Sequence, residues 1–505
     1  MSKPFSFFQR KRHNSETPVV PTLKTVNQVS TVLANNIQQM QTIFGDSSDV
    51  RMIHFLEKPV PFVLYYIEGL INKKQLDSSV IEPINNWQRT KGKSGKATDV
   101  IHQLDVSAEI SSNQQVEDVI MSILKGQVAI FVEGLNEAFT VPLETWPSRA
   151  VEEPIAQTIV RGSREGFTET LLVNTSLIRR RLMDPTLRFK SFQVGNITKT
   201  PILVAYLESQ VEQDVLQEVL KRVANVNTNK VFESGMLEEL IQEKGYSPFP
   251  TFQATERPDS AAAALVEGKV LIMMEGTPFA LITPTTFISF FQAAEDYYHH
   301  FDISTLTRFI RIIAFFLSIS LSAIFIAVTT YHHELIPTSL LVSLAAQREG
   351  VPFPAFVEAL LMEIMFEILR EAGIRMPRPI GSAVSIVGAI VIGESAVAAG
   401  LVSPAIVIVV ALSAISSFVS PYYAHSGAAR LLRFVNMTFA ATAGIFGIIF
   451  FFLGLLIHLC SRTSMGKPFF TPILSFHPDK LKDGIFRFPL WWTQTKFHRK
   501  RAHKS

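Results

Sequence analysis

The sequence predicts an α/β soluble head of two tandem similar modules, followed by an α-helical polytopic membrane domain. Two observations predict this architecture. Near Arg308 a charged chain gives way to long apolar runs, which indicates water on one side of the boundary and lipid on the other. Before that boundary, two stretches of the chain repeat each other about 140 residues apart, as tandem modules would.

The repeat consists of two pairs of matching segments. Residues 61–68 (PFVLYYIE) match 201–208 (PILVAYLE), and residues 124–134 (LKGQVAIFVEG) match 266–276 (VEGKVLIMMEG). Short apolar runs bounded by turn residues are typical of buried strands, and helical patterns lie between them. Chance resemblance between ordinary strand–turn pieces is the alternative, and the agreement of both offsets argues against it. We therefore expect two α/β modules with strands centred on 63–67, 128–132, 203–207 and 270–274.

Several apolar segments are long enough to cross a membrane, since about 20 uncharged helical residues span a hydrocarbon core of roughly 30 Å. A run at 335–346 is too short to span and suits a re-entrant or interfacial helix. Four crossings are the preferred count; the alternative for residues 380–420 is a re-entrant pair in place of two spans. The expected spans are residues 312–331, 380–400, 404–420 and 434–457.

Both ends of the chain are basic, reading MSKPFSFFQRKRH and KFHRKRAHKS, whereas HHELIP after the first span is not. The positive-inside rule therefore predicts that both termini are cytoplasmic. The tails either are solvated or contact anionic headgroups. The first 40 residues hold no apolar h-region, so no cleaved signal peptide is expected. The predicted domains are a basic and polar tail (1–40), module 1 (41–155), module 2 (156–303), a helical membrane domain (304–460) and a basic cytoplasmic tail (461–505).

Composition argues against several classes of function. A net charge of +3 gives no reason to expect a nucleic-acid partner. Cys460 is the only cysteine, so an intrachain disulfide is excluded and a thiolate metal site is not expected. The loop KGKSGKAT fails as a phosphate-binding loop because Thr90 and Ala97 occupy positions that need glycine and a hydroxyl residue. With no HExxH or GxSxG pattern, we predict a non-enzymatic protein without cofactor or metal.

One helix in the membrane half carries carboxylates. Within residues 351–373, Glu363, Glu367 and Glu371 recur every four residues and form one stripe. An amphipathic helix on the membrane surface would explain them. The alternative is a subunit interface or pore, where acidic rings attract cations and Ile364 and Ile368 beside the stripe form an apolar gate.

Glu394 is a second acidic feature, alone in GSAVSIVGAIVIGESAVAAG. It is a candidate intramembrane functional carboxylate, or it marks a helix end between two short spans. The glycines around it permit close helix packing or broken helices.

Several motifs resemble the A subunit of the GerA-type spore germinant receptors of Bacillus-type endospore formers, over about residues 160–492. They are VRGSREGFTETLLVNTSLIRRRL, YSPFP, TERPD, REGVPFPAFVEALLMEIMFEILREAG, PRPIG and VIGESAV. The resemblance implies a receptor of A, B and C subunits in the inner membrane of the endospore. The B subunit is transporter-like and holds the germinant, and the C subunit is a lipoprotein. It also implies that the A subunit oligomerises and provides an ion-conducting path.

Two functions follow as hypotheses. The first is a channel-forming receptor subunit for nutrient-triggered germination, whose partners are the B and C subunits, further copies of itself and membrane lipid. The alternative is a secondary transporter or transport-associated scaffold subunit that binds substrate at broken helices around Gly393 and Glu394. The glutamate stripe favours the first. A transporter usually carries inverted repeats in its membrane part, whereas here the repeat lies in the head.

Overall fold

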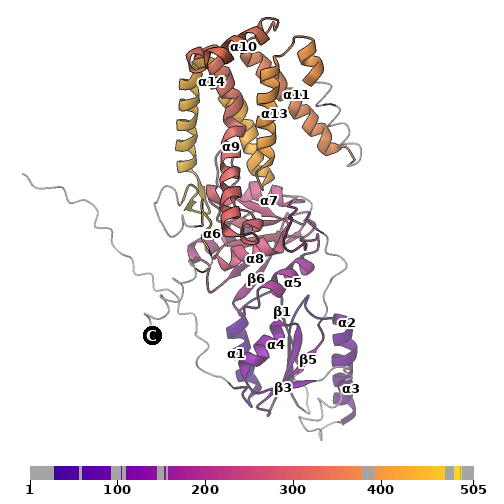
Figure 1. Ribbon diagram of the computed structural model, residues 1–505. Coiled ribbons are helices and arrows are strands. Elements are labelled where there is room, and N and C mark those ends of the chain that lie inside the picture. Colours follow the sequence, from indigo (N-terminus) through magenta and orange to yellow (C-terminus); the bar gives the residue numbers. More distant parts are fainter. Residues whose placement is uncertain are drawn as a thin grey trace, which may run out of the picture. The chain divides into compact units, whose positions relative to one another are not determined.

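The computed structural model describes residues 28–55, 60–91, 104, 110–144, 153–154, 157–377, 388, 393–471, 483–489 and 491. The chain divides into two compact units, which are described separately (Figure 1). Unit 1 comprises residues 1–146 and 183–187, and unit 2 comprises residues 147–182 and 188–505. Most of the predicted tails, of the loop KGKSGKAT and of the span 380–400 lie outside the described residues.

Unit 1 is a five-stranded antiparallel sheet covered by helices on both faces (Figure 1). Its strand order is β1-β2-β4-β5-β3, where β1 is Val50–Phe55, β2 Phe62–Ile67, β3 Ser111–Asn113, β4 Gln127–Val132 and β5 Ala138–Pro142. Helices α1 (Leu33–Phe44) and α4 (Val116–Leu124) pack on one face. The other face is covered by the continuous run of α2 (Lys73–Leu76), η1 (Asp77–Ile81) and α3 (Glu82–Lys91).

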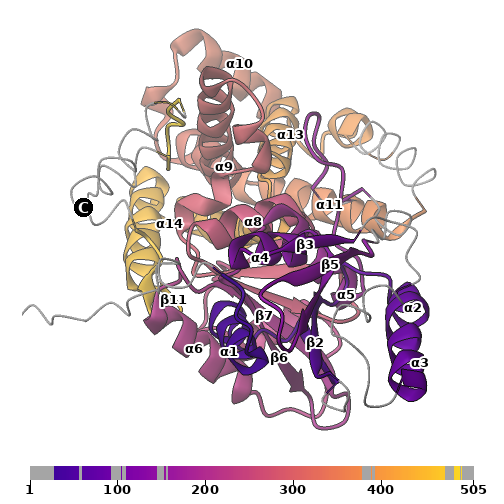
Figure 2. The ribbon, with the colours of Figure 1, turned by 90° about the horizontal axis from the view of Figure 1, so that it is seen from below.

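Unit 2 contains a second five-stranded sheet with the same arrangement. Its order is β6-β7-β9-β10-β8, where β6 is Leu187–Val194, β7 Thr200–Leu207, β8 Gln253–Thr255, β9 Val270–Met274 and β10 Ala280–Thr283. Helices α6 (Gln213–Ala224) and α7 (Ser234–Ile241) cover one face. Helix α8 (Pro258–Val266) lies on the opposite face, beside α5 (Leu171–Arg181) (Figure 2).

The likeness of the two sheets extends to matching hydrogen bonds. Glu133, just after β4, accepts a bond from the amide of Leu33 at the start of α1, at 2.8 Å. Glu275, just after β9, does the same for Leu171 at the start of α5, also at 2.8 Å. In both sheets the carboxylate satisfies an amide that the helix itself leaves unpaired. All four predicted strands are confirmed as β2, β4, β7 and β9, and the shared strand order is what tandem modules require.

Module 1 begins earlier in the structure than residue 41. Val29, Leu33 and Met40 are buried in the core of the first sheet. The described residues 28–40 (QVSTVLANNIQQM) therefore belong to the folded module and not to the predicted basic and polar tail. The packing of α1 on the sheet is difficult to predict from the sequence, because only one narrow face of this helix is apolar.

The remainder of unit 2 is a helical bundle (Figure 1). Helices α9 and α14 are the two among the described residues that are long and apolar enough to cross a membrane. Helix α10 has 11 residues, none of which is buried. The helices are α9 (Phe301–Thr330), α10 (Thr338–Arg348), α11 (Ala355–Arg375), α13 (Pro404–Phe418) and α14 (Tyr423–Ser461).

Helix α14 bends sharply at Gly444, where φ is 59° and ψ is −137°. The rings of Phe439 and Phe451 lie 6.2 Å apart, whereas twelve residues of straight helix would separate them by about 18 Å. A side chain at Gly444 would meet Cε1 of His332 at 2.7 Å. The hydroxyl of Tyr331 donates to the carbonyl of Ala441 at 2.8 Å, next to the bend. The predicted span 434–457 therefore does not run as one straight helix.

The chain is connected to module 2 at both the start and the end of the helical bundle. After α14, β11 (Thr463–Ser464) and β12 (Lys467–Pro468) form a small hairpin. The Ser464 hydroxyl donates to the carbonyl of Thr251 at 2.8 Å, and the amide of Phe287 donates to the carbonyl of Phe469 at 2.8 Å. The chain thus leaves module 2 at α9 and returns to it after α14.

The matched glutamates allow a direct test of the modules' shared design. Replacing Glu275 by alanine should lower the free energy of unfolding by about 1–2 kcal/mol, because the first amide of α5 loses its acceptor. The exposed Glu239 on α7 is the control, and its replacement by alanine should change stability by no more than about 0.5 kcal/mol. Thermal unfolding of the full chain in detergent measures both, and equal effects would contradict the capping role.

Candidate functional site: a charged network inside the helical bundle

The centre of the bundle holds a buried ion pair between Arg433 on α14 and Glu363 on α11. Both side chains are at most 1% exposed. Nη1 of Arg433 donates to Oε2 of Glu363, and Nε donates to the carbonyl of Ser318 on α9 at 2.7 Å. The hydroxyl of Ser322, also on α9, donates to Oε1 of Glu363 at 2.7 Å. Each carboxylate oxygen therefore has a donor.

Helix α13 completes the network. The hydroxyl of Ser413 donates to the carbonyl of Ser318 at 3.2 Å, and its own carbonyl lies 3.5 Å from Nη2 of Arg433. Four helices thus surround one ion pair. Burying two charges is costly, and this cost is offset only when geometry and additional hydrogen bonds are good. The network therefore restricts how the four helices can move relative to one another.

A second buried carboxylate, Glu358, lies near the start of α11. Its Oε1 accepts bonds from the Ser403 amide at 2.6 Å and from the Ser403 hydroxyl. Its Oε2 lies 3.6 Å from Nε of Arg348 on α10. Ser403 is the N-cap of α13, so Glu358 compensates the positive end of that helix. Sequence reasoning missed Glu358 because it is five residues before Glu363 and falls outside the four-residue stripe.

The other two predicted glutamates lie in different environments. Glu367 is partly buried and pairs with Arg370 on the same helix and with Arg430 of α14, at 3.5 Å. Glu371 is exposed and pairs with Arg375 at 2.7 Å. The exposure of the glutamates therefore increases along the stripe, from Glu363 in the bundle interior to Glu371 on the surface.

The predicted gate residues lie on the outer face of α11. Ile364 is 45% exposed and Ile368 is 64% exposed. Val357 and Glu371 continue the same exposed face above and below them. This chain therefore presents an apolar strip that ends in a carboxylate, and nothing else in unit 2 covers it within the described residues.

Glu394 is exposed and lies in a short helical stretch of residues 393–398. Residues 389–392, which precede this stretch, are outside the described part of the chain. Its role as an intramembrane carboxylate therefore stays a prediction. In the described part of the chain, no group of three or more His, Cys, Asp or Glu side chains is arranged to hold a metal ion.

The base of the bundle is fixed to module 2 by a second charged cluster. Asp296 accepts from Nε of Arg308 at 3.0 Å and from Nη1 of Arg311 at 2.6 Å, so each of its carboxylate oxygens binds one arginine of α9. Nη1 of Arg308 also donates to the carbonyl of Asp483 at 2.6 Å. The hydroxyl of Tyr297 donates to Asp483 at 2.6 Å, and burial together with that carboxylate raises the pKa of Tyr297.

Next to this cluster, His425 at the start of α14 lies in an aromatic cage. Its ring stacks on Phe315 of α9 at 4.4 Å and on Phe290 of module 2 at 5.1 Å. The imidazole is fully buried, and neither nitrogen has a hydrogen-bond partner among the described residues. The cage connects module 2, α9 and α14 through packing alone.

Within module 2, the TERPD motif organises the segment that precedes α5. Nη2 of Arg257 donates to the carbonyl of Ser163 at 3.0 Å and to Asp259 at 2.5 Å. Burial alone would raise the pKa of Asp259, but hydrogen bonds from Arg257 and Tyr298 hold it below its usual value. The motif thus has a structural role that its residue types did not reveal in the sequence.

Comparison with known proteins gives close relatives. The family described as Bacillus/Clostridium GerA spore germination protein matches residues 38–499. Spore germination protein KA of Bacillus subtilis (strain 168) is 42% identical over 475 residues, covering 93% of this chain and 86% of that protein. The uncharacterized membrane protein YfkQ of the same organism is 38% identical over 496 residues, covering 98% and 94%. The crystal structure of the N-terminal domain of the A subunit of the Bacillus megaterium spore germinant receptor GerK3 matches 52% of this chain and 99% of that one, with 28% identity and a TM-score of 0.41.

The ion pair predicts non-additive effects of substitution. Replacing Arg433 alone by methionine should lower the free energy of unfolding by about 3–5 kcal/mol, because Glu363 is left buried without its partner. The double variant Arg433→Met, Glu363→Leu should recover most of that loss. The apparent unfolding midpoint in detergent reports both effects. Arg375→Met is the control, since Arg375 is exposed, and a loss no larger than the control's would contradict the network.

Proposed function

Because the chain belongs to the Bacillus/Clostridium GerA family of spore germination proteins, we propose that it is the A subunit of a spore germinant receptor. The observation that carries this proposal is the match of the family over residues 38–499, supported by 42% identity to spore germination protein KA. Its partners would be a transporter-like B subunit, a lipoprotein C subunit and further copies of this chain. The proposed location is the inner membrane of the endospore, and the proposed role is non-catalytic.

The helical bundle supports the membrane location. Two helices are long and apolar enough to cross a bilayer, and the relative YfkQ is named a membrane protein. The chain enters the bundle from module 2 and returns to it, which favours an even number of crossings. The basic tails favour the cytoplasmic side for the head and both termini.

We further propose that copies of the chain form a ligand-gated cation channel in which the outer face of α11 lines the central path. Its support is the exposed strip containing Ile364 and Ile368, followed by Glu371. In a closed ring this strip would become stacked apolar rings and one acidic ring, which suits a gate that closes by dewetting and a mouth that attracts cations. Glu363 has a different task in this arrangement, because it holds α11 to the bundle.

The receptor role predicts a specific loss in spores. Deleting the gene for this chain should abolish germination with its cognate nutrient while leaving germination by a non-nutrient trigger such as exogenous dipicolinate intact, since only nutrient recognition requires the receptor. Loss of optical density after addition of single nutrients measures the response. Restoring the wild-type gene is the control, and an unchanged response to every nutrient would contradict the proposal.

The channel role predicts opposite effects for two changes on α11. Ile364→Asn should let cations leak without germinant, because a polar ring no longer dewets. Glu371→Gln should lower cation flux by about two- to fivefold, because the ring loses its carboxylates and the paired Arg375 is left as an uncompensated cation. Flux of K⁺ from liposomes that contain the assembled subunits measures both.

The control for this experiment is Ile408→Asn, at an isoleucine of α13 that is 69% exposed and therefore at least as accessible as Ile364. It should leave flux unchanged. If Ile364→Asn and Glu371→Gln both behaved like the control in an assembled complex, α11 would not line an ion path.

The topology is tested independently of conduction. A fluorescent-protein fusion at Ser505 should be bright, because that fluorophore matures in the cytoplasm. Alkaline phosphatase fused after Glu334 should be active, because this enzyme needs the outer side of the membrane. The reverse pattern would place the head and both basic tails outside.

A further inference from the structure

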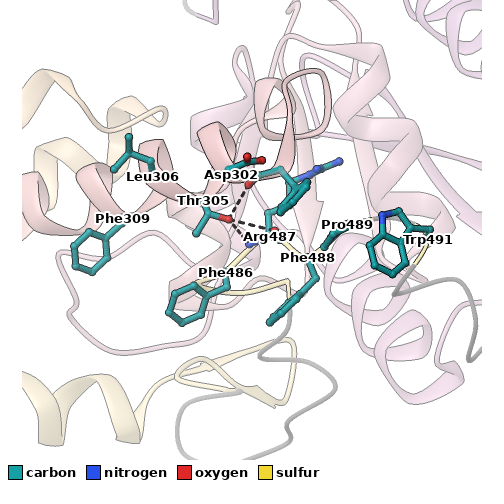
Figure 3. A pocket seen from close by; sticks show the side chains of 10 residues that line it. Asp302, Thr305, Leu306, Phe309, Phe486, Arg487, Phe488, Pro489 and Trp491 are labelled. Carbon is teal, nitrogen blue, oxygen red and sulfur yellow. Dashed lines mark hydrogen bonds between the residues drawn. The ribbon is translucent and has the colours of Figure 1, made fainter.

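An apolar groove lies where α9 leaves module 2 (Figure 3). Its volume is about 790 Å³. One wall is the first three turns of α9, with Leu306 and Phe309, and the other is formed by residues 486–489 and 491, with Phe486 and Trp491. Figure 3 shows Phe486 on the side of Leu306 and Phe309, and Trp491 at the other end, past Phe488 and Pro489.

Hydrogen bonds fix the segment that forms the second wall of the groove. The hydroxyl of Thr305 donates to the carbonyl of Phe301 at 2.8 Å and accepts from the amide of Arg487 at 3.2 Å, and its oxygen lies 3.2 Å from the carbonyl of Arg487 (Figure 3). Asp483, just before this segment, is bound by Arg308 and Tyr297. The segment is therefore fixed along α9 at both of these points, which leaves the apolar side chains in place without a ligand.

The groove is continuous with the outward apolar face of α9. Leu306 and Phe309 are 59% and 50% exposed. Ile310, Ile313 and Phe316 continue this exposed face into the part of the helix that is apolar enough to cross a membrane. An aromatic-rich groove at the end of a membrane helix lies at the depth of the lipid headgroups. Its apolar walls therefore suit an acyl chain.

Charge indicates which lipid the groove would prefer. Arg487 lines the groove and is 6% exposed. Its guanidinium lies 5.3 Å from the ring centroid of Tyr297, and it pairs with no carboxylate of the described residues. The acid on the rim, Asp302, is already hydrogen-bonded to His300. After Asp483 the sequence contains six cationic side chains and no acidic one: Arg487, Lys496, Arg499, Lys500, Arg501 and Lys504.

We propose that this groove binds an anionic phospholipid of the cytoplasmic leaflet. One acyl chain lies between Leu306, Phe309 and Phe486, and the phosphate lies beside Arg487. The lipid would thereby join the first membrane helix to residues 486–489. The inference depends on the membrane location proposed above and is independent of ion conduction.

Trp491 provides the readout, because its side chain is 71% exposed at the groove. The full chain is reconstituted in phosphatidylcholine liposomes that contain a minor fraction of phosphatidylglycerol, with bromine on the acyl chains of one lipid or the other. Bromine quenches tryptophan fluorescence on contact, and the quenching that disappears in Trp491→Phe belongs to Trp491. At equal bromolipid content, we expect brominated phosphatidylglycerol to quench Trp491 about fivefold more than brominated phosphatidylcholine.

Two variants separate the acyl chain from the headgroup. Phe486→Ser should at least halve the quenching by both bromolipids, whereas Ile324→Ser, on an exposed face of the same helix away from the groove, should not. Arg487→Gln should bring the preference for phosphatidylglycerol close to one without lowering the quenching by phosphatidylcholine, because the backbone bonds of residue 487 to Thr305 remain.

Three outcomes would overturn the inference. Equal quenching of the wild type by both bromolipids would show a groove without headgroup preference. Absence of Trp491 quenching in protein that floats with the liposomes would show that another protein segment or a second subunit covers the groove. Failure of the protein to float with liposomes would refute the membrane location as well, so flotation distinguishes the two proposals.

Discussion

The ion pair between Arg433 and Glu363 is the interaction on which the arrangement of the helical bundle depends. It lies among α9, α11, α13 and α14, and each of these helices supplies at least one polar atom to it. A buried pair with this many hydrogen bonds tolerates little rotation of any helix, because rotation would leave a charge without its partner. With Glu363 turned inward, the helical period turns Ile364 and Ile368 outward. The exposed strip of α11 is therefore a consequence of the pair.

Module 2 is connected to the bundle by two contacts of different kinds, one ionic and one aromatic. Asp296 binds Arg308 and Arg311, which is a directional contact that fixes the rotation of α9 about its axis. The cage around His425 is apolar and stacked, so it fixes distance more than rotation. Module 2 and the helices accordingly belong to one compact unit, while module 1 is a unit of its own.

The sequence predicted what depends on local patterns. Short apolar runs bounded by turn residues predicted the four central strands. Short edge strands such as β3 and β8 were not predicted, because three residues carry no clear period and are defined by their neighbours. The bend at Gly444 was not predicted either, since one glycine in an apolar run is ordinary and the contact that requires it comes from His332.

Long-range pairing explains why the candidate site was only partly predictable. The spacing of Glu363, Glu367 and Glu371 showed that they share a side of α11, but not that Arg433, seventy positions later, binds the first of them. Arg433 reads in the sequence as a flanking residue of a span. Only the bend of α14 explains its position, because Arg433 lies on the arm that rises from the head and so passes the middle of α11.

That arm also gives the bundle a continuous path from the head to the outer face of α11. His425 in the aromatic cage and Arg433 in the ion pair are eight residues apart on one helix, about 12 Å along its axis. A helix transmits displacement over such a length because its hydrogen-bonded backbone is stiff compared with the side-chain contacts at its ends. A shift of the Phe290 side of the cage would therefore move Arg433, and Glu363 would have to follow or lose its partner. The strip with Ile364 and Ile368 belongs to the same helix as Glu363, so the ion pair that holds the bundle together is also the point where movement of the head would reach that strip.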